Sequence, residues 1–210
     1  PFGISSAPEI FQREMQKILT GIENVVCQMD DILIYSENLG EHDKKVREVL
    51  DKLQAAGVTL NREKCQFSCR EVKFLGHVIN ENGIQADPEK TDAIRLFATP
   101  TCQSELQRFF GLVNYLGKFS AKIAQQTPNL RRLLGDTDWY WSPQLEQEFI
   151  DVKNEMLKSP ILAPFDLNSD TLVSTDASSF GLGAAIFQKS EEGWKPVAFA
   201  SRSLSPTEQR

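Results

Sequence analysis

The sequence has few cysteines and no long apolar run. Its four cysteines among 210 residues are irregularly spaced, which excludes a dense disulfide framework and favours free thiols in a reducing compartment. No apolar run is long enough to cross a bilayer, and no basic-then-apolar leader opens the printed sequence, so we expect neither a membrane association nor a secretory signal. Internal repeats and low-complexity tracts are also absent, which excludes repeat architectures.

An excess of basic charge is missing as well. The sequence has 23 Lys and Arg against 29 Asp and Glu, a formal net charge of −6, which argues mildly against nucleic-acid binding because phosphate contacts need basic side chains. A basic stripe can still be local, so the net charge excludes no class of function. Cys65, Cys69 and His77 are a conceivable zinc set, but a Cys-x3-Cys spacing without a second tight pair is a weak signal.

The composition is that of a globular protein. Hydrophobic residues make up 40% and charged residues 25%, which are ordinary values. The length suffices for one large domain or two small ones. Because the sequence opens at Pro1 inside what reads as a motif and stops at Arg210 after strand-like residues, we expect a segment with both ends cut.

The first half of the sequence predicts a helix, a hairpin and a second helix. The apolar spacing over residues 8–19 is helical, and two β-rich runs within residues 25–35 flank a polar centre. Residues 39–56 form an amphipathic pattern that ends at Gly57, a residue typical of helix C-termini.

The second half begins with strands and continues with helices. Residues 72–79 are β-rich and lead to Asn82-Gly83, a strong hairpin signal. Asp87-Pro88 is a helix start, and helical patterns follow to Leu134, with breaks near Pro100, Gly117 and Pro128. Residues 135–138 are the best candidate linker.

A last helix and three strands complete the pattern. Ser142-Pro143 starts a helix with Leu145, Phe149, Val152 and Met156 on one face, and it ends near Pro160. Strand-like runs follow at 171–175, 183–187 and 196–200. The order predicts a mixed α/β (α+β) fold, in which two partial α/β units are bridged by helices.

Asp30-Asp31 is the sharpest chemical feature. Adjacent side chains on a regular strand face opposite sides, but at the bend of a hairpin both carboxylates can approach a common point. Mg²⁺ prefers a few carboxylate oxygens completed by water and substrate phosphate, and two such ions promote nucleotidyl transfer. The alternative is a solvated Asp-Asp turn, which the pair alone does not exclude.

Several blocks of sequence, taken in order, resemble reverse transcriptases of gypsy-type LTR retrotransposons. They include the substrate-site block Pro1–Gln12 (PFGISSAPEIFQ), Gln28-Met29-Asp30-Asp31, the primer-gripping block Phe74–Ile79 (FLGHVI), the thumb-side block Leu106–Phe119, and Thr175–Ala184. The last block is similar to the opening strands of the family's ribonuclease H domain. Together they span nearly the whole chain.

The resemblance implies a domain order and an activity. Residues 1–83 would be the C-terminal part of the palm, 84–136 the thumb or connecting helices, and 137–210 the N-terminal part of a ribonuclease H-like domain. The parent Pol polyprotein would be a multifunctional enzyme, a nucleotidyltransferase for RNA- and DNA-templated DNA synthesis and an endonuclease (a hydrolase) that cleaves RNA in RNA–DNA hybrids.

The resemblance also implies cofactors and partners. The cofactor would be Mg²⁺, with Mn²⁺ as a substitute, and the partners a template with primer, an RNA–DNA hybrid and deoxynucleoside triphosphates. A homodimer stays open, and no membrane is expected. By family analogy the protein would act in cytoplasmic virus-like particles, with nuclear entry as a further expectation.

Site residues carry over by position in the matching motifs. The metal-binding catalytic carboxylates would be Asp30, Asp31 and Asp176; the substrate-binding residues would be Phe2, Gly3 and Gln28; the primer-binding residues would be Phe74, Leu75, Gly76 and His77. From the residues alone, Asp176 could equally be a turn cap at the end of a strand.

Departures from the family pattern leave an alternative open. Gln28 stands where the family has an aromatic residue, which predicts altered primer positioning and unchanged metal binding. Glu208 matches a Glu that precedes the family's catalytic one, so we assign it no catalytic role. With further carboxylates expected outside the segment, both metal sites are incomplete and the segment alone would be inactive. The alternative is a decayed or domesticated nucleic-acid-binding or structural module without catalysis.

Other aromatic and basic residues have simpler interpretations. Trp139, Tyr140 and Trp141 could stack on bases, although an aromatic cluster beside a linker is more often packing. Arg131-Arg132 could contact phosphates or could be a solvated helix face.

Overall fold

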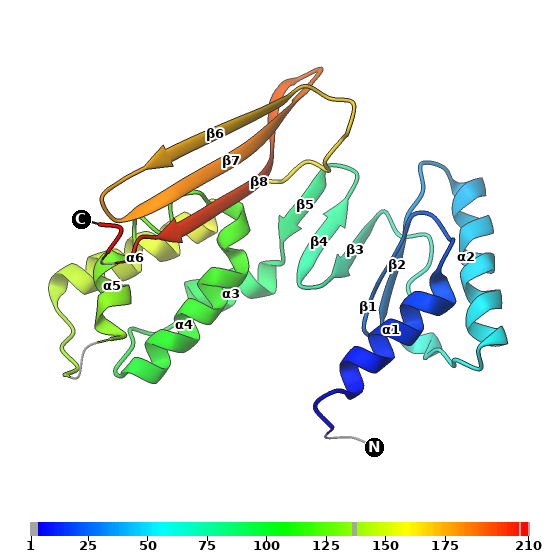
Figure 1. The fold of residues 1–210 in the computed structure, drawn as a ribbon, viewed down its shortest axis with the longest axis horizontal. Helices are drawn as coiled ribbons and strands as arrows, with labels where there is room; N and C mark the ends of the chain where they lie inside the picture. Colours follow the sequence, from blue (N-terminus) through cyan, green and yellow to red (C-terminus); the bar gives the residue numbers. More distant parts are fainter. Residues whose placement is uncertain (1–3, 136–137, 206, 210) are drawn as a thin grey trace. The chain divides into compact units, whose positions relative to one another are not determined.

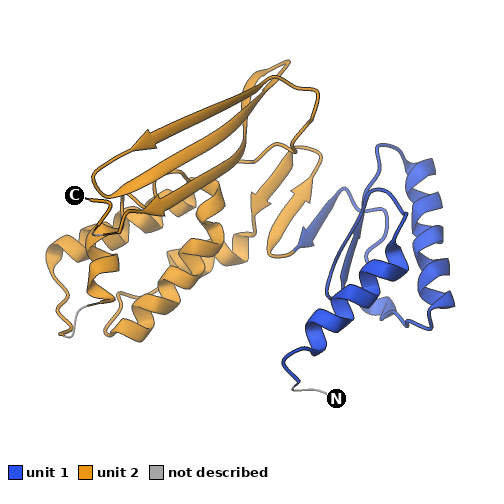
Figure 2. Cartoon of the chain, viewed as in Figure 1, with its two compact units in different colours: residues 1–74 blue, residues 75–210 orange. Residues whose placement is uncertain are grey.

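The computed structural model describes residues 4–135, 138–205 and 207–209. The chain divides into two compact units, Pro1–Phe74 and Leu75–Arg210 (Figure 2). Both combine helices with antiparallel strands, which confirms the predicted mixed α/β class. Within the described part, no helix has the length and apolar character that a membrane span requires. The division into palm, thumb and ribonuclease H-like parts stays a prediction.

The first unit follows the predicted order of elements. It consists of α1 (Ala7–Leu19), β1 (Val25–Gln28), β2 (Asp31–Ile34), α2 (Leu39–Ala55), the short 3-10 helix η1 (Arg62–Lys64) and β3 (Glu71–Phe74) (Figure 1). The side chain of Asn38 accepts a hydrogen bond from the amide of Glu41 and so caps α2, because the first amides of a helix lack partners inside it. Gly57 has φ +71 after α2, as the predicted stop requires.

A small core holds the first unit together. Met15 and Leu19 of α1 and Val49 and Leu53 of α2 are buried against one another, and one face of the β1–β2 hairpin packs on them. Fully burying such a side chain stabilises a fold by about 1.5–3 kcal/mol. Both helices therefore support the hairpin from one side.

In its described residues, the second unit contains a hairpin, four α-helices, a short 3-10 helix and a three-stranded sheet. Its elements are β4 (His77–Asn80), β5 (Gly83–Ala86), α3 (Pro88–Arg95), α4 (Gln103–Leu116), η2 (Gly117–Phe119), α5 (Pro128–Leu133), α6 (Pro143–Leu157), β6 (Thr171–Ala177), β7 (Gly181–Ser190) and β8 (Gly193–Ser203). Asp87 caps α3 and Ser142 caps α6, each with proline at the next position. Both predicted helix starts are confirmed.

The core of the second unit is larger and rich in aromatic rings. Phe109 of α4 and Phe149 of α6 lie with their ring centroids 4.6 Å apart, and both are almost completely buried. Trp141 packs edge-on against Phe149 and stacks on Trp139. This part of the aromatic cluster is therefore packing, whereas Tyr140 is 72% exposed.

The strands β6, β7 and β8 form an antiparallel sheet in that order. Helices α4, α5 and α6 lie on one side of this sheet in Figure 1. The register shifts between Ile186 and Phe187, at the point where Phe187 pairs with Pro196, which has no amide hydrogen to donate. A bulge on an edge strand accommodates such a proline, so β8 continues through a residue that usually ends a strand.

The hairpin β4–β5 turns one residue earlier than the sequence predicts. Asn80 pairs with Gly83, so Glu81-Asn82 form the loop and Gly83 begins β5 with φ +131. The carbonyl of Leu162 comes so close that a Cβ at position 83 would overlap it, while Ile84 and Leu162 exchange two hydrogen bonds of 2.8 Å. Glycine is needed here for a tertiary contact.

Candidate active site

The two adjacent carboxylates lie at the turn of the β1–β2 hairpin, as predicted. Gln28 pairs with Asp31, so Met29 and Asp30 form a two-residue turn and Asp31 begins β2. Met29 has φ +55, a conformation that residues other than glycine seldom adopt. Asp30 and Asp31 are both exposed. The bend therefore presents two consecutive carboxylates to solvent on a short, defined loop.

Gln12 of α1 holds this turn in place. Its side-chain carbonyl accepts a hydrogen bond from the amide of Met29, and its Nε2 donates to the carbonyl oxygen of Cys27 at 2.9 Å. Both groups of one amide side chain thus bind the backbone immediately before Asp30. The side chain of Gln12, on α1, therefore stabilises the unusual conformation of Met29. The sequence predicts no role for Gln12 itself, although Gln12 closes the substrate-site block Pro1–Gln12.

The hairpin has one covered and one open face. Val25 and Cys27 of β1 are half-buried against the core, whereas Val26 and Gln28 alternate with them and are exposed. Burial, and to a lesser extent the negative charge of Asp31, raises the pKa of the Cys27 thiol. Cys27 is therefore a neutral packing residue beneath the turn, and Gln28 lies on the open face beside the carboxylates.

The hairpin carboxylates are available as metal ligands as far as the described residues show. Neither Asp30 nor Asp31 makes an ion pair among residues 4–135, 138–205 and 207–209. Two free carboxylates and open solvent suit Mg²⁺, which takes one or two protein carboxylates and leaves its other positions to water and phosphate. In the described residues no three His, Cys, Asp or Glu side chains gather as a metal site, and this includes the Cys65, Cys69 and His77 alternative.

The predicted primer-binding residues lie around a second tight turn. Phe74 ends β3 in the first unit, and Leu75 and Gly76 open the second unit with φ +47 and φ +64. His77 begins β4 and is buried. Burial and then the positive charge of Lys118 lower the pKa of His77, while Asp87 opposes them. The imidazole is therefore neutral near pH 7.

The third predicted carboxylate, Asp176, lies on β6 in the second unit. It pairs with Gly183 of β7, and a Cβ at position 183 would meet the carbonyl oxygen of Ala121 at 2.8 Å. Gln125 Nε2 lies 3.4 Å from the carboxylate of Asp176, a long hydrogen bond. Asp176 is exposed, as is every residue of β6. Asp176 and Gly183 line a shallow groove over the sheet together with Arg202.

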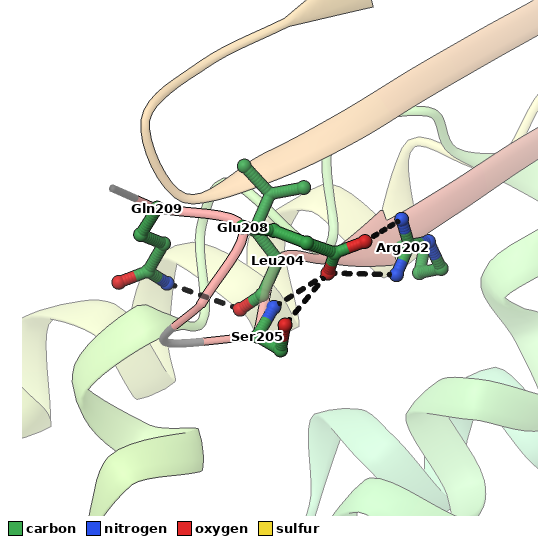
Figure 3. Close-up of polar contacts among 5 residues, drawn as sticks. All are labelled: Arg202, Leu204, Ser205, Glu208 and Gln209. Atoms are coloured by element: carbon green, nitrogen blue, oxygen red, sulfur yellow. Dashed lines mark hydrogen bonds and ion pairs between the residues drawn. The ribbon is translucent and has the colours of Figure 1, made fainter.

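Glu208 lies in the segment that follows β8 and binds residues at the end of that strand. Arg202 at the end of β8 donates to both of its carboxylate oxygens, at 3.1 and 2.8 Å (Figure 3). The amide and hydroxyl of Ser205 each donate to Oε2 at 2.9 Å. These bonds lower the pKa of Glu208 to about 2. A Glu that accepts from the amide of a Ser three residues earlier is half of a capping box, so these bonds indicate a structural role for Glu208.

Other predicted residues have varied positions. Phe2 and Gly3 lie outside the described residues. Arg131 of α5 stacks over Phe110, with its guanidinium carbon 4.6 Å from the ring centroid, and binds Asn114 and Thr127. Its charge is thus engaged within the unit, whereas Arg132 is exposed. All four cysteines are free thiols.

Comparison with known families assigns both ends of the chain. Residues 1–79 match the family described as reverse transcriptase (RNA-dependent DNA polymerase). Residues 141–210 match the RNase H-like domain found in reverse transcriptase. The first match includes the Asp30-Asp31 hairpin, and the second includes Asp176.

Curated relatives match along nearly the whole chain. The transposon Tf2-3 polyprotein of Schizosaccharomyces pombe is 39% identical over 209 residues, or 98% of this chain. The transposon Tf2-7 polyprotein of the same organism has the same identity and coverage. The chain spans only 16% of the length of these relatives.

Solved structures show the same fold. The foamy viral protease-reverse transcriptase in complex with an RNA/DNA hybrid matches with a TM-score of 0.88 and 25% identity, covering 100% of this chain and 29% of that one. The same protein in complex with dsDNA matches with a TM-score of 0.87 and covers 44% of that chain. The chain therefore belongs to the reverse transcriptases of gypsy-type LTR retrotransposons, with a ribonuclease H-like domain in its C-terminal part.

Proposed function

We propose that the full-length protein that contains this chain synthesises DNA on RNA and DNA templates and cleaves RNA in RNA–DNA hybrids. The family supports the reaction class, and the relatives' greater length is why the activity is attributed to the full-length protein. The observation that carries the proposal is the β1–β2 turn. It presents Asp30 and Asp31 side by side, without ion pairs among the described residues, on a loop fixed by Gln12.

The residues of the β1–β2 turn would bind the metal ion and orient the substrate. We propose that Asp30 and Asp31 hold Mg²⁺, with Mn²⁺ as a substitute, through their exposed carboxylate oxygens. When bound, the metal supplies charge that favours attack by the primer 3′-hydroxyl and departure of pyrophosphate. Because the turn is already fixed, the carboxylates need little reorganisation when substrate arrives. Gln28, on the open face beside them, would hydrogen-bond a base or a sugar where an aromatic residue would stack.

The ribonuclease H reaction is proposed for the second unit. Asp176 would contribute a metal-binding carboxylate there, at the edge of the groove that Gly183 and Arg202 also line. The partners would be a primed template, an RNA–DNA hybrid and deoxynucleoside triphosphates. The neighbouring structures hold an RNA/DNA hybrid and dsDNA, which supports nucleic acid as the class of partner. Cytoplasmic particles stay the proposed location.

Separation of the two activities tests the proposal. In the full-length protein, Asp30→Asn should lower primer extension by at least about 100-fold, because a metal ion contributes several kcal/mol to the transition state and each ~1.4 kcal/mol is tenfold. Cleavage of a labelled RNA–DNA hybrid should stay unchanged. Asp176→Asn should have the reverse effect. Asp43→Asn and Asp170→Asn are matched controls, since both residues are exposed acids outside the two sites.

The outcomes distinguish the alternatives. Primer extension undiminished by Asp30→Asn would contradict the role of the hairpin. Template-primer binding that is insensitive to Mg²⁺, with no synthesis by the full-length wild-type protein, would favour the decayed or domesticated binding module. A stable complex with an active partner, without intrinsic activity, would favour the structural role.

A further inference from the structure

Tyr115 of α4 contacts the turn formed by Leu75, Gly76 and His77, which the sequence resemblance predicts to bind the primer. Its hydroxyl donates to the carbonyl oxygen of Leu75. Its ring stacks on His77 with centroids 5.4 Å apart and planes 9° from parallel. A Cβ at Gly76 would overlap the hydroxyl oxygen, and it would lie 3.1 Å from Cζ. One side chain thus touches all three residues of the turn that belong to the second unit.

The turn has a conformation that needs such support. Leu75 has φ +47 and Gly76 has φ +64. A left-handed conformation disfavours a branched or bulky side chain such as that of Leu75, so it persists only where the surroundings favour it. The bond from Tyr115 to the Leu75 carbonyl supplies part of that support, because it holds the peptide group between Leu75 and Gly76 in one orientation.

His77 also packs against a second aromatic ring. The residue is 8% exposed, and the centroid of its ring lies 5.8 Å from that of Phe119. Among the residues that the structure describes, its buried Nδ1 has no hydrogen-bond partner, so the ring contacts with Tyr115 and Phe119 contribute to its orientation. Tyr115 itself is 42% exposed, which leaves its outer edge accessible beside the turn.

We propose that Tyr115 is a positioning residue for the primer 3′ terminus, which it orients by fixing the backbone of Leu75-Gly76 from helix α4. The inference rests on the proposed function, because it assigns the turn to primer binding. It adds a residue outside the primer-binding block, on a helix of the thumb-side segment. It also explains glycine at position 76: the hydroxyl of Tyr115 occupies the place of a side chain.

The first test compares Tyr115→Phe with Tyr140→Phe in the full-length protein. Tyr140→Phe is the matched control, because Tyr140 is 72% exposed in the same unit. Loss of one hydrogen bond should lower the rate of nucleotide addition roughly 5-fold for Tyr115→Phe, while the template-primer Kd changes less than about twofold. The penalty for extending a primer with a mismatched 3′ end should also change, which a purely structural defect would not cause.

The second test couples the two sides of the contact. Gly76→Ala should lower nucleotide addition more than Tyr115→Phe does, since the new Cβ meets the hydroxyl. In the Tyr115→Phe background the same Gly76→Ala change should cost less, because the clash with the hydroxyl is gone while the left-handed strain and the contacts with the ring carbons remain. The thermal unfolding midpoint of each variant shows whether a lower rate comes from a less stable fold or from a displaced Leu75-Gly76 turn.

The results distinguish this inference from the proposed function. Wild-type primer extension together with unchanged rates and mismatch discrimination in Tyr115→Phe would overturn the positioning role and leave the proposed function intact. Independent, multiplicative effects of Gly76→Ala and Tyr115→Phe would also overturn it. No primer extension by the wild-type protein would overturn the proposed function, and the positioning role with it.

Discussion

The two candidate sites of this chain are supported in opposite ways. Asp30 and Asp31 lie on a short hairpin whose inner face packs on two helices and whose turn is bound by Gln12. Asp176 lies on a longer strand with every residue exposed, held by pairing with β7 and a 3.4 Å contact with Gln125. In the first site, packing and the hydrogen bonds of Gln12 hold the backbone that carries the carboxylates. In the second site, pairing of β6 with β7 holds the backbone at Asp176, and the contact with Gln125 adds little.

The difference shows that strand length is a poor guide to how firmly a site is held. A four-residue hairpin strand is marginal by itself, yet the β1–β2 turn has support on its covered face and at its bend. The seven residues of β6 have a complete ladder on one side, and the helices of the unit lie on one face of its sheet (Figure 1). Variants that remove packing, backbone clearance or side-chain bonds should therefore affect the two regions differently.

The largest effect should come from the core of the second unit. Phe149→Ala should lower the free energy of unfolding by about 3–5 kcal/mol, as for other buried aromatic residues. The exposed Phe165→Ala is the control, because Phe165 is 56% exposed. All three tryptophans, Trp139, Trp141 and Trp194, lie in this unit, so tryptophan fluorescence during urea unfolding follows it specifically. A loss below about 1 kcal/mol would contradict the assigned core.

A smaller effect is expected at the strand that pairs with Asp176. Gly183→Ala places a Cβ 2.8 Å from the carbonyl oxygen of Ala121, and such overpacking costs about 1–3 kcal/mol. Gly111→Ala is the control, since nothing lies within 4 Å of its added Cβ. Urea unfolding followed by fluorescence measures both variants. Equal stability of the two would show that β7 does not lie close against residue 121.

Substitution of Gln12 should have a smaller, local effect on the stability of the β1–β2 turn. Gln12→Leu removes two hydrogen bonds and should cost about 1–2 kcal/mol locally. The measurement is hydrogen exchange at the Met29 amide, which should become faster. Gln12→Glu is the matched control, because a carboxylate can still accept from Met29 but cannot donate to Cys27, so its effect should be intermediate. Unchanged exchange in Gln12→Leu would mean that the turn is held by the hairpin alone.

The smallest effect concerns Glu208. Its pKa should be about 2, below its ordinary value of 4.5, because Arg202 and Ser205 bind the charged form. A depressed pKa stabilises the fold fully above pH 4.5, and this contribution is lost as the pH falls toward 2. Carboxyl NMR titration should give this pKa in the wild-type chain. Arg202→Gln should raise it toward 4.5, and an ordinary pKa in the wild type would contradict the contacts.

Local patterns in the sequence predict most of the fold. The hairpin around Asp30-Asp31 and the helices starting at Pro88 and Pro143 are confirmed, since strand alternation, N-caps and proline act within a few residues. β8 is longer than residues 196–200, because the bulge that admits Pro196 depends on the partner strand. The shifted turn at Gly83 depends on Leu162, which is distant in sequence.

The sequence predicts the charged residues of the candidate sites, and it does not predict the residues that support them. Asp30, Asp31 and Asp176 have recognisable local contexts, and each lies within a segment that matches one of the two families. The roles of Gln12 and Tyr115 are not visible in the sequence. Both act on backbone groups of another element, through contacts between residues 17 and 40 positions apart, and a periodic pattern carries no information on such pairs.

The most direct test of the account is the rate of single-nucleotide addition by the full-length protein carrying Asp31→Asn, measured in Mg²⁺ on a primed template under single-turnover conditions. Asp51→Asn, an exposed acid on α2 of the same unit, is the control. We predict a loss of at least about 100-fold for Asp31→Asn and wild-type rates for Asp51→Asn. Equal rates for both variants would contradict the claim that the β1–β2 turn holds the metal.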